Sequence, residues 1–246
     1  MSLSRFVPIG LPKLVSSAEV IFPDSQWPHQ SDAGRLRSKI IKLLKPDLKQ
    51  EPAFYPLHNH VDSSLSVIYY RIINDIARIG AIGEGTHVLK HYLTTFFEVF
   101  ETEKEFLQFY HFDYRERLDP IGFTDSPITY CITDWLPFSE RGGVNFKKEY
   151  DFCKTEEQRK ALLRLLLKDQ ILALLRRLDY DAAYQLSFEV ASPQRPVLTY
   201  IKKYNKLLKF NLLRKQFFRV NFQLPPQVAF GEHTSIGFGR CELVNH

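Results

Sequence analysis

Two histidines separated by one residue, His58 and His60, are the side chains of this sequence best suited to chemistry. In an extended segment the side chains at i and i+2 point to the same face, whereas in a helix they diverge. Pro56 disfavours a helix just before them, so the geometry in which the two imidazoles converge is favoured. Imidazole has an ordinary pKa of about 6.5, so such a pair could act as general acid and base near neutral pH.

Two other interpretations of this segment stay open. His58 and His60, with Asp62 two residues on, could bind a divalent ion, although the further ligands that would complete such a site are not evident. Alternatively, the histidines pack in a polar turn in which Asn59 makes a local hydrogen bond. For a His-x-His in an arbitrary protein, this last interpretation is the commonest.

A basic block lies in the C-terminal part of the chain. Residues 190–231 contain eight basic residues and no acidic one, and the rest of the chain contains 25 basic and 28 acidic residues. Tyr200, Tyr204, Phe210, Phe217 and Phe218 are interleaved with the cations. Phosphate-neutralising charge beside aromatic rings is typical of nucleic-acid binding, while a solvated loop over core aromatics is the plain alternative.

Composition limits the class of protein. The 246 residues, 44% hydrophobic, suffice for one large or two ordinary domains. No stretch approaches the roughly 20 apolar residues of a membrane span and the start lacks a secretory pattern, so we expect a cytoplasmic protein without membrane contact. Cys131, Cys153 and Cys241 have no paired short spacing, so we expect reduced, mostly buried thiols.

The spacing of apolar residues and the positions of proline, glycine and capping residues predict the secondary structure. We expect strands over 13–22 and 67–74, a helix over 33–45 that Pro46 ends, and a helix over 83–97 entered through a glycine turn. Residues 119–127, DPIGFTDSP, predict a turn, and 128–138 predict a strand. Thr155 and Gln158 form a capping box that opens a long helix. Its apolar stripe is Leu163, Leu167, Ile171, Leu174 and Leu178, and short strands follow over 185–191, 197–202, 216–224 and 237–244.

This order of elements predicts an α+β fold. Strand, helix and strands occur twice, as in two tandem ferredoxin-like β-α-β-β-α-β domains. We place the N-terminal domain, with the His-x-His segment, at 1–125, and the C-terminal domain, with the basic block and a glycine-rich stretch, at 126–246.

The glycine-rich stretch AFGEHTSIGFGRCEL places Gly231, Gly237 and Gly239 before the last predicted strand. A turn with outward amides can hold phosphate oxygens, although a hairpin with a β-bulge explains the same glycines. A Walker loop is excluded because the GK[ST] ending is missing.

Several motifs in order resemble one family. NFQLPP followed by the stretch ending in GFG is similar to the C-terminal signature of CRISPR-associated repeat-RNA processing endoribonucleases of the RAMP superfamily. RLRSKIIKLL, PLHNH, YYR and IGEGTHVL resemble the N-terminal half of their subtype I-B-like lineage. ITYCITDWLPF, FKKEYDF and ALLRLLLKDQILALLRRL resemble its middle and helical segments. The likeness covers most of the chain.

The resemblance implies a metal-independent endoribonuclease that uses no cofactor and cuts CRISPR repeat RNA into mature guide RNAs. A base removes the 2′-hydroxyl proton, that oxygen attacks the adjacent phosphorus, and an acid protonates the leaving 5′-oxygen, giving 2′,3′-cyclic phosphate and 5′-hydroxyl ends. The lineage's histidine pair implies that His58 and His60 form this site. Lys49, Tyr69 and Tyr70 are candidates to stabilise charge on the phosphate.

RNA contacts are expected from the basic block and the glycine-rich stretch. The residues are Lys202, Lys203, Lys206, Lys209, Arg214, Lys215, Arg219, Gly231, His233, Ser235, Gly237 and Gly239. The alternative function is a RAMP-fold RNA-binding subunit of a CRISPR effector complex that cuts nothing, since fold does not determine function. An enzyme that has lost activity but still holds the RNA is a third alternative. Association with an effector complex or with a second copy as a homodimer is left open.

Overall fold

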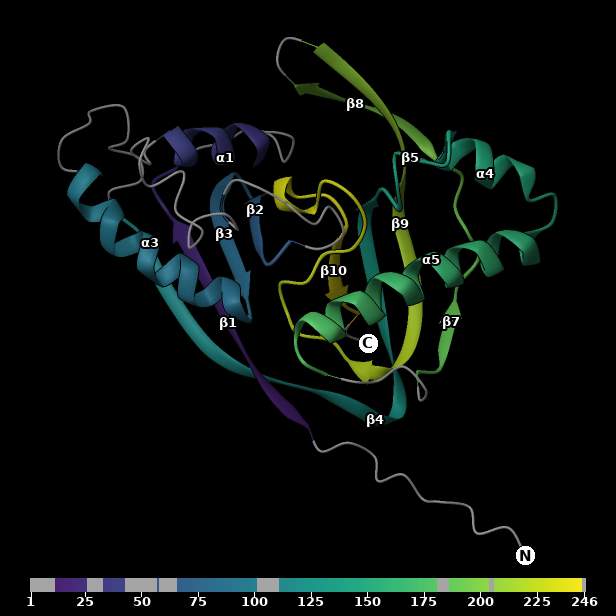
Figure 1. Ribbon diagram of the computed structural model, residues 1–246, viewed down its shortest axis with the longest axis horizontal. Helices are drawn as coiled ribbons and strands as arrows, with labels where there is room; N and C mark the ends of the chain where they lie inside the picture. Colours follow the sequence, from purple (N-terminus) through teal and green to yellow (C-terminus); the bar gives the residue numbers. More distant parts are fainter. Residues whose placement is uncertain are drawn as a thin grey trace, which may run out of the picture.

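The computed structural model is an α+β protein built around one large antiparallel sheet with helices packed on it (Figure 1). It describes residues 12–25, 33–42, 57, 66–100, 111–180, 186–203 and 206–244, and of residues 94–100 and 201–208 the backbone alone. Within these residues, no helix has both the length and the apolar character that a membrane span requires.

The N-terminal half forms a complete ferredoxin-like unit. Its elements are β1 (Lys13–Phe22), α1 (Ala33–Lys42), β2 (Ile68–Ile73), β3 (Ile76–Ile82), α3 (Glu84–Phe100) and the first part of β4 (Asp113–Trp135). The strand order is β2-β3-β1-β4 with antiparallel neighbours. The Tyr92 hydroxyl of α3 donates to the Ile40 carbonyl of α1 at 2.9 Å, so the two helices lie side by side. The predicted strands over 13–22 and 67–74 and both predicted helices are confirmed.

The C-terminal half repeats this order with one change. Its sheet runs β10-β4-β9-β7, from the second part of β4, β7 (Phe188–Val190), β9 (Lys206–Gln223) and β10 (Arg240–Leu243). Helix α5 (Glu156–Arg177) packs beside β7. The second helix of the repeat is replaced by an irregular stretch containing the 3-10 helix η5 (Thr234–Ile236). Two tandem ferredoxin-like units are therefore confirmed, the second with one helix fewer than predicted.

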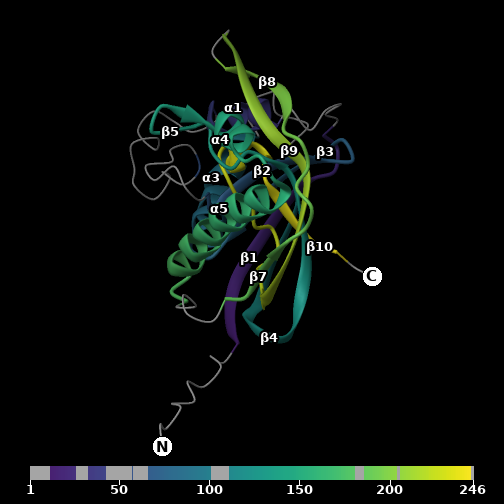
Figure 2. The same cartoon turned by 90° about the vertical axis from the view of Figure 1, so that its right-hand side faces the viewer.

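Further elements extend the C-terminal unit. A small hairpin pairs β5 (Glu140–Arg141) with β6 (Val144–Asn145), and α4 (Phe146–Phe152) follows it. Strand β8 (Val197–Lys203) pairs with β9, and the resulting hairpin extends beyond the body of the protein (Figure 2). Cys241 is buried and Cys131 and Cys153 are half-buried, all three as free thiols.

The turn predicted over residues 119–127 is wrong. These residues lie inside β4, which runs without interruption from Asp113 to Trp135. The first part of β4 pairs with β1 up to Ile121, and the second part pairs with β9, with a register shift between Phe123 and Ile128. Pairing partners on both sides overcome the local turn preference, and the irregular residues are absorbed as a bulge. The boundary drawn between residues 125 and 126 falls within this shift.

Strand β3 was not predicted, although its turn has a recognisable sequence. Asn74 and Asp75 have φ values of 51° and 63°, and they connect the antiparallel strands β2 and β3 in a two-residue turn. Such turns need positive φ at both central residues, which Asn and Asp tolerate better than most residues. The pair could therefore have marked the end of β2 and the start of β3.

Helix α5 begins and packs as its sequence predicts. The five residues of the apolar stripe are all buried against the sheet. Trp135 at the end of β4 is fully buried, and its Nε1 donates to the Gln170 side chain at 3.2 Å. The Gln170 amide in turn donates to the Pro137 carbonyl at 3.0 Å, which ties α5 to the chain leaving β4.

The capping box at the start of α5 provides a stability prediction. The backbone N–H of Gln158 donates to the Thr155 hydroxyl at 3.2 Å, and the backbone N–H of Thr155 donates to the side-chain oxygen of Gln158 at 3.1 Å. We expect Thr155→Ala to cost about 1 kcal/mol, since one end amide loses its partner. That loss corresponds to a melting temperature lower by about 2 to 4 °C, measurable by calorimetry. Thr155→Ser keeps the hydroxyl and should melt like the wild type; equal melting of all three proteins would contradict the prediction.

Candidate functional site

Only one residue next to the histidine pair is described. Lys49, His58 and His60 lie outside the described residues, as does Asp62 of the alternative metal site. Leu57, which immediately precedes His58 in the sequence, is fully buried, and its carbonyl accepts a hydrogen bond from the Tyr70 hydroxyl at 3.1 Å. Leu57 is thereby tied to β2.

Tyr69 and Tyr70 are adjacent in β2, so their side chains point to opposite faces of the sheet. Neither side chain reaches the surface of the described structure. Burial raises the pKa of Tyr69 to about 12, although the nearby Arg71 guanidinium lowers it in part. Burial also raises the pKa of Tyr70, partly offset by Arg37. Both phenols are therefore neutral near pH 7.

Arg71 connects β2 to the chain that leaves β9. Its Nη1 donates to Gln227 Oε1 at 2.6 Å, and its Nη2 donates to the Gln227 carbonyl at 2.7 Å. Burial is the main reason why the pKa of Arg71 falls to about 10, which still leaves the side chain charged at neutral pH. The Nη2 of Arg71 also donates to the Val228 carbonyl at 3.4 Å, so the cation keeps this stretch of chain beside the N-terminal unit.

The glycine-rich loop, residues 230–239, has two glycines at which an added side chain would clash with the backbone. A Cβ on Gly231 would lie 2.2 Å from the Leu136 carbonyl oxygen, and one on Gly239 would lie 1.8 Å from the Phe230 oxygen. Gly237 has φ of 96°, in the left-handed region that favours glycine. These glycines are thus explained by the packing of the loop, whether or not it contacts RNA.

Half of the ten backbone amides of the loop are used inside the protein. Five of them donate to backbone carbonyls at 2.8 to 3.1 Å, namely those of Phe230, Glu232, Ile236, Gly237 and Gly239. The Glu232 carboxylate accepts a hydrogen bond from the Ser139 hydroxyl. Because these donors already have partners, the loop differs from an open phosphate cradle with all its amides turned outward.

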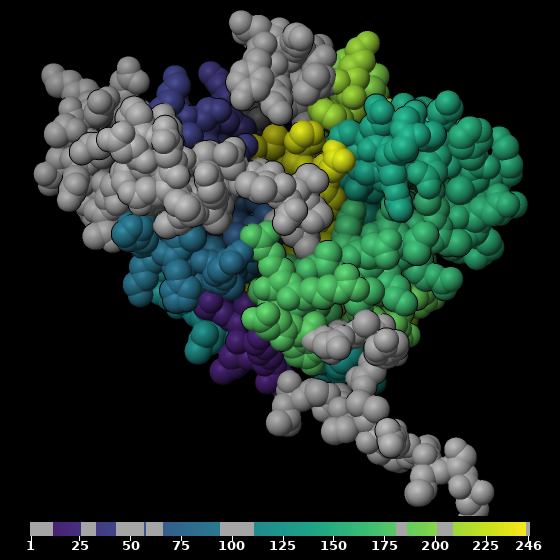
Figure 3. Space-filling view, viewed as in Figure 1, coloured from purple at the N-terminus to yellow at the C-terminus, as the bar shows by residue number. Residues whose placement is uncertain are grey.

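The glycine-rich loop lies against the N-terminal unit. A Cβ on Gly237 would be 3.5 Å from the Tyr70 carbonyl oxygen and 3.4 Å from the Ala33 Cβ of α1. Ser235 is buried there, and the His233 ring packs edge-on against Phe210 of β9 with centroids 4.9 Å apart. In the space-filling view, part of this stretch, in yellow, reaches the surface between α1 and the C-terminal unit (Figure 3). The loop therefore bridges the two units.

The predicted basic block is divided between two surfaces. Lys202, Lys203 and Lys206 lie in the β8–β9 hairpin, and of their side chains nothing is described. Lys209 is exposed and lies opposite Tyr200 in register, with its Nζ 6.0 Å from the ring centroid. An exposed cation beside a half-exposed ring is a pair that could contact a phosphate and a base.

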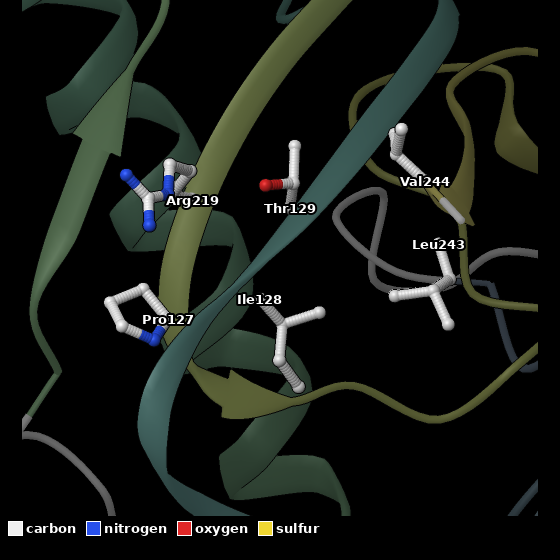
Figure 4. Close-up of a pocket in the computed structure, with 6 residues that line it drawn as sticks. All are labelled: Pro127, Ile128, Thr129, Arg219, Leu243 and Val244. Carbon is white, nitrogen blue, oxygen red and sulfur yellow. The ribbon is translucent and has the colours of Figure 1, made fainter. Parts of the chain in front are cut away.

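The other basic residues lie nearer the body of β9. Arg214 forms an ion pair with Asp134 at 2.8 Å, and Lys215 is exposed. Lys215, Phe217 and Arg219 alternate on one exposed face of the strand. Arg219, with Glu189 4.0 Å away, lines a shallow depression with Pro127, Ile128, Thr129, Leu243 and Val244 (Figure 4).

Sequence reasoning missed three of these features: the β8–β9 hairpin, the Arg71–Gln227 contact and the hydrogen bond between Tyr70 and Leu57. Tyr204 and Asn205 between two β-rich runs could have indicated the hairpin. The two contacts carry no local signal, because their partners are far apart in the sequence.

Comparisons with known proteins agree with this architecture. A family model described as the Cas6b C-terminal domain matches residues 122–244, which is half of the chain. An uncharacterized protein of Methanocaldococcus jannaschii is 29% identical over 124 residues, covering 50% of this chain and 77% of that protein.

Solved structures show the same fold across nearly the whole chain. A crystal structure of Cas6b is similar with a TM-score of 0.65 at 20% identity, covering 94% of this chain and 100% of that one. A second, described as the CRISPR RNA processing endoribonuclease Cas6b, has a TM-score of 0.63 at 20% identity with the same coverage. A type IV Cas6 crRNA endonuclease, Csf5, has a TM-score of 0.53 at 16% identity over 95% of this chain and 100% of its own. With its C-terminal half matched by the family model, the chain belongs to the Cas6b family.

Proposed function

We propose that this protein is a metal-independent endoribonuclease that cuts CRISPR repeat RNA to produce guide RNAs. The observation that carries the proposal is the position of Tyr70, whose hydroxyl holds Leu57 just before the histidine pair and whose carbonyl lies against Gly237. Leu57, one residue before the histidine pair in the sequence, and Gly237 of the glycine-rich loop thus both lie against Tyr70 of β2. The description of one similar structure as a CRISPR RNA processing endoribonuclease supports the same reaction.

The reaction we propose is attack of a 2′-hydroxyl on the adjacent phosphorus. One of His58 and His60 removes the hydroxyl proton, and the other protonates the departing 5′-oxygen. The bond between phosphorus and the 5′-oxygen breaks as the new one forms, so the products carry a 2′,3′-cyclic phosphate and a 5′-hydroxyl. The reaction needs the 2′-hydroxyl, and this requirement also distinguishes RNA from DNA.

A second candidate function is RNA binding without cleavage, in a CRISPR effector complex. The exposed pair of Lys209 and Tyr200 on the hairpin favours it, since binding needs such a surface and no histidine pair. In either role we place the protein in the prokaryotic cytoplasm. Association with an effector complex or with a second copy is tested by measuring molecular mass with and without RNA.

The test of the proposed function is cleavage of the cognate repeat RNA in EDTA, with analysis of the product ends. We expect cleavage in EDTA, cyclic-phosphate and 5′-hydroxyl ends, and no cleavage of a substrate with a 2′-deoxy nucleotide at the scissile position. Inhibition by EDTA would replace the histidine mechanism with a metal site. Tight binding without any cleavage would establish the non-catalytic function instead.

RNA binding by the hairpin gives a further prediction. Lys209→Gln removes an exposed charge, so we expect weaker binding whose dependence on log salt is shallower by about 0.7 to 0.9. Arg115→Gln removes an exposed charge from the N-terminal part of β4 and serves as the matched control. Binding should be measured by fluorescence anisotropy at several salt concentrations. An unchanged salt slope for Lys209→Gln, or an equal change in the control, would contradict a contact between Lys209 and phosphate.

A further inference from the structure

The charged residues of helix α1 are all positive. Four of its ten residues are basic and none is acidic, and the four are Arg35, Arg37, Lys39 and Lys42. The helix packs into the protein through apolar residues that are fully buried, namely Ala33, Leu36 and Ile40. Four basic residues and no acidic one give α1 a net charge of +4 at neutral pH.

Three of these cations share one side of the helix. Arg35, Lys39 and Lys42 are separated by four and three residues, so they follow one another along the same face. Arg35 and Lys42 are exposed, and Lys39 is half-buried. A rise of about 1.5 Å per residue spreads the three positions over roughly 10 Å. We call Arg35, Lys39 and Lys42 the α1 stripe.

Helix stability explains the α1 stripe only in part. The helix dipole favours cations in the last turn, where Lys39 and Lys42 lie. Arg35 is the third residue of the helix, at the end where the dipole disfavours a cation. Arg35 and Lys39 are also like charges four residues apart, a spacing that destabilises a helix. A bound anion would offset both unfavourable effects.

The start of α1 packs against the glycine-rich loop. A Cβ on Gly34 would lie 3.9 Å from the Ile236 side chain, and one on Gly237 would lie 3.4 Å from the Ala33 Cβ. In the space-filling view, α1, in dark blue, reaches the surface beside the yellow loop (Figure 3). Arg35 follows these contacts directly in the sequence, so the α1 stripe begins beside the loop.

The part of the loop that contacts α1 carries no negative side chain. Residues 233–239 contain no acidic residue. Glu232, which precedes them, is bound elsewhere: its carboxylate accepts a hydrogen bond from the Ser139 hydroxyl, and its backbone N–H donates to the Leu136 carbonyl at 2.8 Å. An anion that follows the α1 stripe to residues 233–239 therefore meets no carboxylate of these two elements.

We infer that the α1 stripe binds the phosphate backbone of repeat RNA beside the glycine-rich loop. This inference rests on the proposed function, because it names the ligand of a surface that would hold the RNA for processing. Cations in a row neutralise phosphates along a strand, and such contacts depend on salt but not on base sequence. The predicted basic block lies in the C-terminal unit, so the α1 stripe adds a place of contact on the N-terminal unit.

The variant that tests this inference is the triple substitution Arg35→Gln, Lys39→Gln and Lys42→Gln. Glutamine is uncharged and forms helices about as well as lysine and arginine do. The matched control on α5 is Arg164→Gln, Lys168→Gln and Arg176→Gln. Two of these three residues are exposed and Lys168 is half-buried, as in the α1 stripe. The control therefore removes the same charge from the same kinds of position on a different helix.

The measurement is the salt dependence of RNA affinity, by fluorescence anisotropy between about 50 and 200 mM salt, for the cognate repeat and an unrelated RNA of equal length. Each lost phosphate contact makes the slope of log affinity against log salt shallower by about 0.7 to 0.9. We expect the stripe variant to lose about 2 to 3 from this slope with both RNAs, and the α5 control to keep the wild-type slope. An unchanged slope, an equal change in the control, or a change with the cognate RNA alone would overturn the inference.

Two single variants repeat the test with less disturbance of the helix. Arg35→Gln and Lys42→Gln stand at opposite ends of the α1 stripe. Each should make the slope shallower by about 0.7 to 0.9, while circular dichroism shows the helix content of the wild type. If both folded variants kept the wild-type slope, the inference would be wrong even where the triple variant does not fold.

Cleavage measured on the same preparations separates this inference from the proposed function. If the wild type binds repeat RNA through the α1 stripe but never cuts it, the proposed function fails and the inference stands. If the wild type cuts the RNA and the stripe variant keeps the wild-type slope, the inference alone fails. A wild type that binds no RNA at all would overturn both.

Discussion

His58→Ala and His60→Ala are each expected to slow cleavage of the cognate repeat RNA by about 100- to 10,000-fold. That is the usual contribution of one general acid or base, and each substitution removes one of the two proton transfers in the proposed reaction. RNA affinity should stay within about threefold of the wild type, because we expect the phosphate contacts to lie on other side chains. Single-turnover rates and direct binding, measured in EDTA on the same preparations, check both parts.

The control for these variants is His87→Ala. His87 is an exposed histidine on α3, and it has no proposed role in the reaction. It should cleave at the wild-type rate. If His58→Ala and His60→Ala also cut at that rate, the histidines are not the acid and base, and the polar-turn interpretation of the segment is the correct one.

Gly239→Ala is expected to lower the free energy of unfolding by about 3 kcal/mol or more. Gly239 has φ of 66°, and a Cβ there would lie 1.8 Å from the Phe230 carbonyl oxygen. The left-handed backbone alone costs an alanine about 1 to 2 kcal/mol, and the contact with backbone adds to this because neither partner can rotate away. Calorimetry should show a melting temperature lower by roughly 6 to 12 °C.

Gly142→Ala isolates the backbone part of that cost. Gly142 also has positive φ, 57°, but no atom lies within 4 Å of the position of its added Cβ. We expect it to lose only about 1 to 2 kcal/mol. If Gly239→Ala lost no more than Gly142→Ala, the close approach to Phe230 would not constrain the loop. RNA binding by Gly239→Ala should be compared below its melting temperature, so that unfolding is not mistaken for a lost contact.

Local patterns predicted helices α1, α3 and α5 because the determinants of these three helices are local. Helix α5 begins at the predicted capping box, and its apolar stripe is the buried one, since both depend on residues three or four positions apart. Strands β1 and β2 were predicted for a similar reason, because β-branched and aromatic residues favour a pleated, buried surface.

Strand continuity was not predictable in the same way. Residues 119–127 have the composition of a turn, yet they lie in β4 because β1 and β9 supply pairing partners along it. The irregular replacement for the second helix of the C-terminal unit likewise depends on contacts with β2 and α1. Such contacts outweigh local preference, and a single sequence does not reveal them.

The sequence by itself determined which groups are available for chemistry: a histidine pair behind a proline, a basic block with aromatic residues, and glycines at three positions near the C-terminus. The tertiary structure decided how these groups are arranged. It buries Tyr69 and Tyr70, divides the basic residues between a hairpin and a sheet face, and uses the glycines for close packing. The reason is that burial and proximity depend on strand order and register between distant residues, which local spacing does not encode.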